Sequence, residues 1–102
     1  MASVYVELFK MIAGFDSQAR RAAYVRLKTK LELARKEDAA IARNGMPRVM
    51  DLVQGYLRET RLKELRGTAG TYRLRKELVG RTSAAVAPAR VVDMLIVELL
   101  VQ

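Results

Sequence analysis

The sequence of 102 residues contains no cysteine and no histidine. Without cysteine, the chain can form neither a disulfide nor a thiolate metal site. Without histidine, it lacks the commonest general base and the commonest metal ligand, and its serines and threonines have no imidazole to activate them. These absences argue against an enzyme, so we predict no catalytic residue, no metal site and no cofactor.

Long hydrophobic runs and acidic residues are also scarce. The longest apolar stretches are far shorter than the ~20 residues that a membrane-spanning helix needs. The 19 lysines and arginines outnumber the 11 aspartates and glutamates, which gives a formal charge of +8. This excess favours anionic partners such as nucleic acid or lipid headgroups, but charge alone does not choose between them.

Two segments near the start of the sequence have the alternation of β-strands. Residues 4–9 form a short strand, and residues 24–34 show the clearest alternation in the chain. In the second segment, one face carries Val25, Leu27, Thr29, Leu31 and Leu33, and the other carries Arg26, Lys28, Lys30 and Glu32. The charged face is expected to be solvated, with lysines that discourage aggregation; a dedicated binding surface is the alternative.

The closing segment, residues 90–102, is rich in valine, leucine and isoleucine and predicts a strand buried on both faces. Strict alternation places Val92, Met94, Ile96 and Leu100 on one face, and Val91, Leu95, Val97, Leu99 and Val101 on the other. Asp93 and Glu98 then fall on opposite faces and cannot form a catalytic pair. We expect Glu98 to pair instead with an arginine or lysine of a neighbouring element.

Helices are predicted between these strands. Glu37 and Asp38 suit a helix start, and Pro47 predicts a kink or a restart. The resumed helix should continue to about Leu65, with an apolar stripe formed by Val49, Leu52, Val53, Tyr56 and Leu57. Thr68 is a plausible N-cap for a last helix that carries Leu74, Leu78, Thr82 and Ala85 and ends at Pro88.

The predicted order is β-β-α-α-β in a single domain that covers residues 1–102. This order indicates an α+β fold, with a small, largely antiparallel three-stranded sheet and helices packed on one face. If helices cover only that face, the other side of the last strand is left for another subunit or a neighbouring surface.

Several segments together resemble a known family over nearly the whole chain. They are Y-V-R-L-K-T-K-L-E-L at 24–33, M-P-R-V-M-D at 46–51, L-R-G-T at 65–68, L-R-K-E-L at 74–78 and V-D-M-L-I-V-E-L-L-V-Q at 92–102. This combination resembles the periplasmic domain of the flagellar basal-body-associated FliL family, whose fold is similar to the stomatin (SPFH) domain. The sequence departs from the family pattern at residues 9–11 and 68–72, which affects local loop geometry rather than the fold.

The resemblance implies a non-enzymatic scaffold on the periplasmic face of the bacterial inner membrane. The full protein would be a single-pass membrane protein whose N-terminal anchor is absent from this sequence. It would assemble into rings beside the flagellar stator and support torque, swimming and swarming. In such an assembly, strand surfaces are candidate contacts with other copies or with partners, namely Tyr5, Glu7, Phe9, Arg26, Lys28, Lys30, Leu95, Val97 and Leu99.

Two other interpretations use the basic residues. Gly67 and Gly70 form a G-x-x-G sequence flanked by arginines and lysines, as in a nucleic-acid-binding KH domain. That interpretation requires a different order of strands, and the chain has few aromatic residues to stack on bases. The basic surface could also contact anionic lipid headgroups, which is compatible with a domain anchored close to a bilayer.

Overall fold

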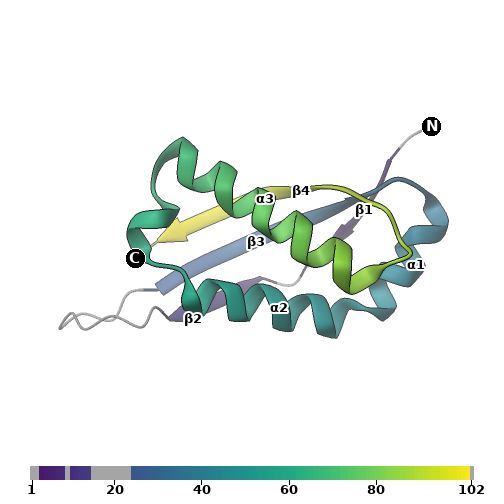
Figure 1. The fold of residues 1–102 in the computed structure, drawn as a ribbon, viewed down its shortest axis with the longest axis horizontal. Coiled ribbons are helices and arrows are strands. Elements are labelled where there is room, and N and C mark those ends of the chain that lie inside the picture. Colours follow the sequence, from purple (N-terminus) through teal and green to yellow (C-terminus); the bar gives the residue numbers. More distant parts are fainter. Residues whose placement is uncertain (1–2, 9, 15–23, 102) are drawn as a thin grey trace.

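The computed structural model describes residues 3–8, 10–14 and 24–101, which form an α+β fold of two layers. Four strands form the sheet: β1 (Val4–Glu7), β2 (Met11–Gly14), β3 (Tyr24–Leu33) and β4 (Val91–Val101). The helical layer consists of α1 (Lys36–Asn44), α2 (Met46–Glu59), the short 3₁₀ helix η1 (Leu62–Leu65) and α3 (Gly67–Val86). Figure 1 shows α2 and α3 lying side by side across one face of the sheet. The predicted fold class is confirmed.

β3 is the central strand, and every pairing in the sheet is antiparallel. β1 pairs with one half of β3 and β2 with the other, while β4 runs along nearly the whole length of β3. Since Glu7 faces Lys30 and Met11 faces Leu27, four steps along the first segment oppose three along β3. β1 and β2 therefore behave as one interrupted strand. The alternation at residues 4–9 predicted β1, but β2 was not predicted.

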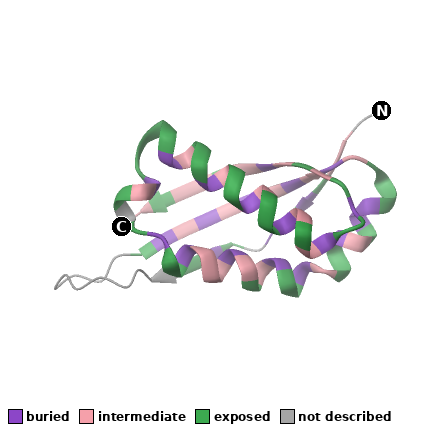
Figure 2. Cartoon of the chain, viewed as in Figure 1, coloured by how far each residue is buried: buried purple, intermediate pink, exposed green. Residues whose placement is uncertain are grey.

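The core lies between the helices and one face of β3. Val25, Leu27, Leu31 and Leu33 are completely buried, which confirms the alternation predicted for this strand and is visible along β3 in Figure 2. Across the layer, the buried side chains include Met46, Val49, Val53 and Leu57 of α2 and Leu74, Leu78, Thr82 and Val86 of α3. Their spacing of three or four residues turns one stripe of each helix toward the sheet, where burial of apolar area stabilises the fold.

The break between α1 and α2 lies at Gly45, and α2 begins at Met46 with Pro47 in its first turn. This position suits proline, because the first amides of a helix have no partner within the helix. The predicted restart at Pro47 is confirmed. Gly45 also lies close to α3, since a Cβ at this position would come within 3.3 Å of Val86.

Two predicted helix boundaries are wrong. α2 ends at Glu59 rather than near Leu65, because Thr60 is extended and its hydroxyl donates to the carbonyl oxygen of Tyr56 at 2.7 Å. α3 begins at Gly67 with Arg66 as its N-cap, so Thr68 lies inside the first turn and cannot cap it. The predicted stop before Pro88 is confirmed, since α3 ends at Val86.

A buried carboxylate fixes the start of α1. Asp38 is completely buried, and its two oxygens accept hydrogen bonds of 3.0 and 3.3 Å from the Arg35 guanidinium. These hydrogen bonds hold the pKa of Asp38 below its ordinary value, against the effect of burial, which raises it. Next to this pair, the amide of Ala34 donates to the carbonyl oxygen of Arg90 at 3.1 Å, so the end of β3 is tied to the chain that enters β4.

β4 does not follow strict alternation, because its pairing with β3 shifts register at two places. Lys28 pairs with Glu98 and Thr29 with Ile96, which leaves Val97 as an extra residue; Val92 is left in the same way between Val91 and Asp93. The residues facing the helices are therefore Val91, Met94, Ile96, Leu99 and Val101, opposite the buried residues of β3. The predicted division into two faces is wrong, because it placed Met94 and Ile96 on the face opposite Val91, Leu99 and Val101.

Candidate interaction surface

The face of the sheet that points away from the helices is covered by no described element. We call it the outer sheet face. It consists of residues that alternate with the buried ones, namely Tyr5, Glu7, Ile12, Arg26, Lys28, Lys30, Glu32, Leu95, Glu98 and Leu100. The alternation that buries one side of each strand presents these side chains on the other side.

The structure brings together six of the nine residues proposed as contacts. Tyr5 and Glu7 lie on β1, and Arg26, Lys28 and Lys30 follow one another on the adjacent β3. Leu95 faces Lys30 from β4, on the same side of the sheet. Phe9 lies outside the residues that the structure describes.

Two of the proposed contacts lie elsewhere. Leu99 pairs with the buried Leu27 and packs against the core, so it faces the helices rather than sharing a face with Leu95. Val97 is the extra residue at a register shift, and about half of its surface is exposed (51%). The sequence placed Leu95, Val97 and Leu99 together because a bulge leaves no mark in a run of valine and leucine.

Opposite charges alternate across the outer sheet face. Lys30 lies 3.6 Å from the carboxylate of Glu7, and Arg26 lies 3.9 Å from that of Glu98. The predicted pairing of Glu98 with a basic residue is confirmed. The carboxylate of Asp93 lies 3.8 Å from Arg75 of α3, on the helical side, which agrees with the prediction that Asp93 and Glu98 lie on opposite faces. These ion pairs are exposed and contribute little to stability, so they serve complementarity with a partner as readily as folding.

Exposed apolar side chains flank the charged centre of the outer sheet face. Tyr5, Ile12 and Leu100 are 49%, 55% and 43% exposed, and they come from three different strands. Exposed large apolar side chains on a face that no described element covers are candidate contacts with another protein. The residue Ile12 was not singled out in the sequence because β2 was not recognised as a strand.

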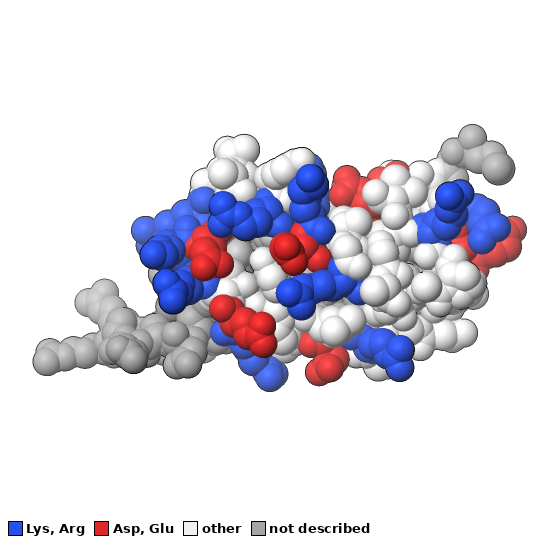
Figure 3. All heavy atoms as spheres, in the orientation of Figure 1, with Lys and Arg blue, Asp and Glu red and all other residues white. Residues whose placement is uncertain are grey.

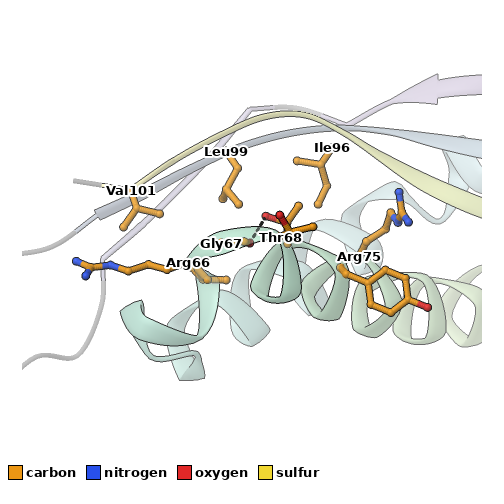
Figure 4. A pocket seen from close by; sticks show the side chains of 10 residues that line it. Arg66, Gly67, Thr68, Arg75, Ile96, Leu99 and Val101 are labelled. Atoms are coloured by element: carbon orange, nitrogen blue, oxygen red, sulfur yellow. Dashed lines mark hydrogen bonds between the residues drawn. The ribbon is translucent and has the colours of Figure 1, made fainter.

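A second surface lies on the helical side, between the start of α3 and the end of β4. We call it the α3–β4 groove; its volume is about 790 Å³. Ile96, Leu99 and Val101 point into it from β4, and Arg66 and Arg75 lie at its two ends (Figure 4). Sequence reasoning missed this groove, because it depends on how far α3 covers β4, which no local pattern encodes.

The G-x-x-G sequence does not form the loop that a KH domain would use to clamp a phosphate backbone. Residues 67–70 are the first turn of α3, and Gly70 is buried. A Cβ on Gly70 would lie 2.5 Å from the carbonyl oxygen of Glu64, so glycine is required here for close packing against η1. The structure thus gives Gly70 a packing role, whereas Gly67 adopts a φ of 75°, a backbone conformation that favours glycine.

Comparison with known proteins agrees with the resemblance noted in the sequence. A family model described as "Flagellar basal body-associated protein FliL" matches residues 5–102. The chain belongs to the FliL family. The "Flagellar FliL protein" of Caulobacter vibrioides, from strain NA1000 / CB15N and from strain ATCC 19089 / CIP 103742 / CB 15, is 35% identical over 98 residues in each case.

These matches cover 96% of this chain and 48% of each relative, so the chain spans about half the length of the curated FliL proteins it matches. Membership of the FliL family identifies a flagellar basal-body protein that belongs to the motility apparatus.

Among the helices in the described part of the chain, none combines the length and the apolar character that crossing a bilayer requires.

Proposed function

We propose that this domain is a non-enzymatic scaffold of the flagellar motor, which packs against copies of itself and against the stator through its outer sheet face. The observation that carries this proposal is that the described helices cover one side of the sheet and no described element covers the other. The open side combines a charged centre with exposed Tyr5, Ile12 and Leu100. Membership of a family associated with the flagellar basal body supports a role for the domain in the motor.

In this proposal the domain lies on the periplasmic side of the inner membrane and belongs to a single-pass protein. The relatives are about twice as long as this chain, which leaves room for an anchor in the full protein. Side-by-side packing of copies around a central partner would give a ring that supports stator function, torque and swimming or swarming. Such an assembly needs shape and charge complementarity rather than chemistry at a reactive group.

Site-directed cross-linking tests the outer sheet face directly, because the chain has no native cysteine. Lys28→Cys and Leu95→Cys place single thiols on this face, and Arg48→Cys places one on the exposed side of α2. In cells that make the full-length protein, oxidation should link each of the first two variants to a second copy with the same thiol, or to a stator protein into which a cysteine has been introduced, but should not link the third. Equal cross-linking of all three, or none at the outer face, would contradict the proposal.

Motility gives a second readout. Reversing charges on the outer sheet face with the double variant Lys28→Glu and Lys30→Glu should reduce swimming under viscous load, because repulsion replaces complementary contacts. Arg48→Glu is the matched control on the helical side. Unchanged motility of the double variant, at wild-type protein levels, would argue against the outer sheet face as the contact surface.

A further inference from the structure

The α3–β4 groove has an apolar floor that the helices leave partly open. Ile96, Leu99 and Val101 lie opposite Thr29, Leu27 and Val25, all three of which are completely buried. On the same face of the same strand, Met94 is also completely buried, whereas Ile96, Leu99 and Val101 are only partly buried. The first turns of α3 therefore cover β4 less completely beyond Met94, and an apolar strip of β4 is left available for a further side chain.

The hollow continues along the seam between α3 and β4. A neighbouring depression of about 340 Å³ shares Tyr72 and Arg75 with the groove and extends it to Val92 and Asp93. Together, the two depressions follow β4 from Val92 to Val101. A long open trough of this shape suits an extended chain, whereas small-molecule sites enclose most of their ligand.

The edge of β4 beside this trough is free. β4 pairs with β3 on one side, and none of the described strands pairs with its other side. An edge strand presents amide and carbonyl groups that another extended chain can pair with. Alternate side chains of such an added strand would face the helical side of the sheet and enter the trough.

The charge around the trough selects the kind of chain. Arg66 and Arg75 lie at the two ends of the α3–β4 groove (Figure 4), and Lys76 lies beside Arg75 on α3. Arg75 and Lys76 both approach the ring of Tyr72, at 5.7 and 5.2 Å from its centroid, and Asp93 lies 3.8 Å from Arg75. Three cations thus face one carboxylate. Figure 3 shows lysine and arginine side chains gathered around the end of the molecule where α3 starts.

We propose that the α3–β4 groove binds an extended acidic peptide of another protein, which adds as a strand to the free edge of β4. Its apolar side chains would rest on Ile96 and Leu99, and acidic side chains on the same face would pair with Arg66 and Arg75. This inference goes beyond the proposed function, which concerns the outer sheet face, and either of the two can fail while the other holds.

A synthetic peptide with the sequence Glu-Thr-Val-Thr-Val-Thr-Glu, blocked at both ends, is the probe. Its valines and glutamates share one face of a strand, so they enter the trough together. Binding to the whole chain is measured by NMR titration of the backbone amides. We expect saturable shifts of the amides of β4 from Ile96 to Val101. The same peptide with lysine in place of glutamate should bind at least roughly tenfold more weakly.

Charge-reversal variants test the predicted contacts. The double variant Arg66→Glu and Arg75→Glu should weaken binding of the acidic peptide by roughly tenfold or more. Arg73→Glu is the matched control, because it makes the same change at an exposed position of α3 outside both depressions. A peptide with N-methyl groups on alternate residues should also lose affinity, since it cannot donate to the edge of β4.

Three results would overturn the proposal. The first is the absence of saturable shifts in β4, and the second is equal binding of the acidic and basic peptides. The third concerns the occupant: if the acidic peptide does not bind, but the double variant abolishes self-association of the chain in sedimentation experiments, the groove holds a second copy instead. Cross-linking through Lys28→Cys and Leu95→Cys reports separately on the outer sheet face, so failure of one proposal is distinguishable from failure of the other.

Discussion

The buried carboxylate of Asp38 accepts two hydrogen bonds from the guanidinium of Arg35, three residues earlier in the chain. Asp38 itself lies in the first turn of α1, where a negative charge also suits the positive end of the helix. Arg35 precedes the helix, so the pair holds the turn between β3 and α1. A charge buried in this way stabilises the fold only while it stays ionised and paired.

Stability should therefore decrease in acid. The folded protein lowers the pKa of Asp38 below the value of about 3.9 that aspartate has in unfolded chains. The stabilising contribution is present above about pH 3.9 and is lost as the pH falls through the lower folded-state pKa. Urea unfolding across this range measures it. Asp38→Asn should be less stable than the original chain at pH 7, and the difference should shrink in acid, whereas Asp51→Asn at an exposed position should show no such trend.

Two glycines of α3 should respond oppositely to alanine. Gly70→Ala forces a Cβ within 2.5 Å of the carbonyl oxygen of Glu64 and 2.8 Å of the carbonyl carbon of Leu65, and should cost about 1–3 kcal/mol through overpacking. Gly80→Ala meets nothing within 4 Å and should stabilise the helix by about 0.5–1 kcal/mol. The free energy of unfolding in urea measures both changes. If Gly70→Ala loses no stability, the close approach of α3 to η1 is wrong.

Thr29→Val should stabilise the protein. The hydroxyl of Thr29 is completely buried on the core face of β3, and it finds no hydrogen-bond partner among the described residues. Valine has nearly the same shape and removes the cost of burying that group, so we expect a gain of about 1 kcal/mol in the free energy of unfolding. Thr68→Val is the control at an exposed position and should change stability by less than about 0.5 kcal/mol. A loss of stability in Thr29→Val would show that the hydroxyl is bonded.

Deleting Val97 should leave the faces of β4 unchanged. Val97 stands opposite no residue of β3, so its removal lets Ile96 and Glu98 keep their partners Thr29 and Lys28. We expect a folded domain within about 1–2 kcal/mol of the original, because only local twist changes. Deleting Lys30 from β3, which has no extra residue to take its place opposite Leu95, should instead move the side chains on one side of the gap to the wrong face and cost more than about 3 kcal/mol. Circular dichroism and urea unfolding distinguish these outcomes.

Much of the fold could be predicted where one local rule decides it. The alternation in β3 was predicted correctly because one face of that strand is wholly buried and the other carries charge. Pro47 correctly predicted the start of a new helix, because a residue without an amide hydrogen is tolerated in the first turn. These signals lie within a few residues of the feature they predict, so a single sequence is sufficient to read them.

The rest depends on contacts between distant segments. The bulges at Val92 and Val97 are set by the pairing of β4 with β3, and a run of apolar residues offers no signal for them. α2 ends just before Thr60, whose hydroxyl donates a hydrogen bond to the carbonyl oxygen of Tyr56. The apolar pattern of the sequence does not indicate this end. The α3–β4 groove follows from the length of β4 that α3 leaves uncovered. The position of Tyr72 and Arg75 at this groove could therefore not be predicted from the sequence.

The central position of β3 ties the other three described strands into one sheet. All pairings pass through this strand, so separating β3 from its neighbours would leave no two described strands joined. Hydrogen exchange at the buried half of β3 should accordingly require global unfolding, whereas β1, β2 and β4 can open from either side without dissolving the whole. Local opening that exposes a strand for assembly is thus confined to β1, β2 and β4, while β3 stays paired.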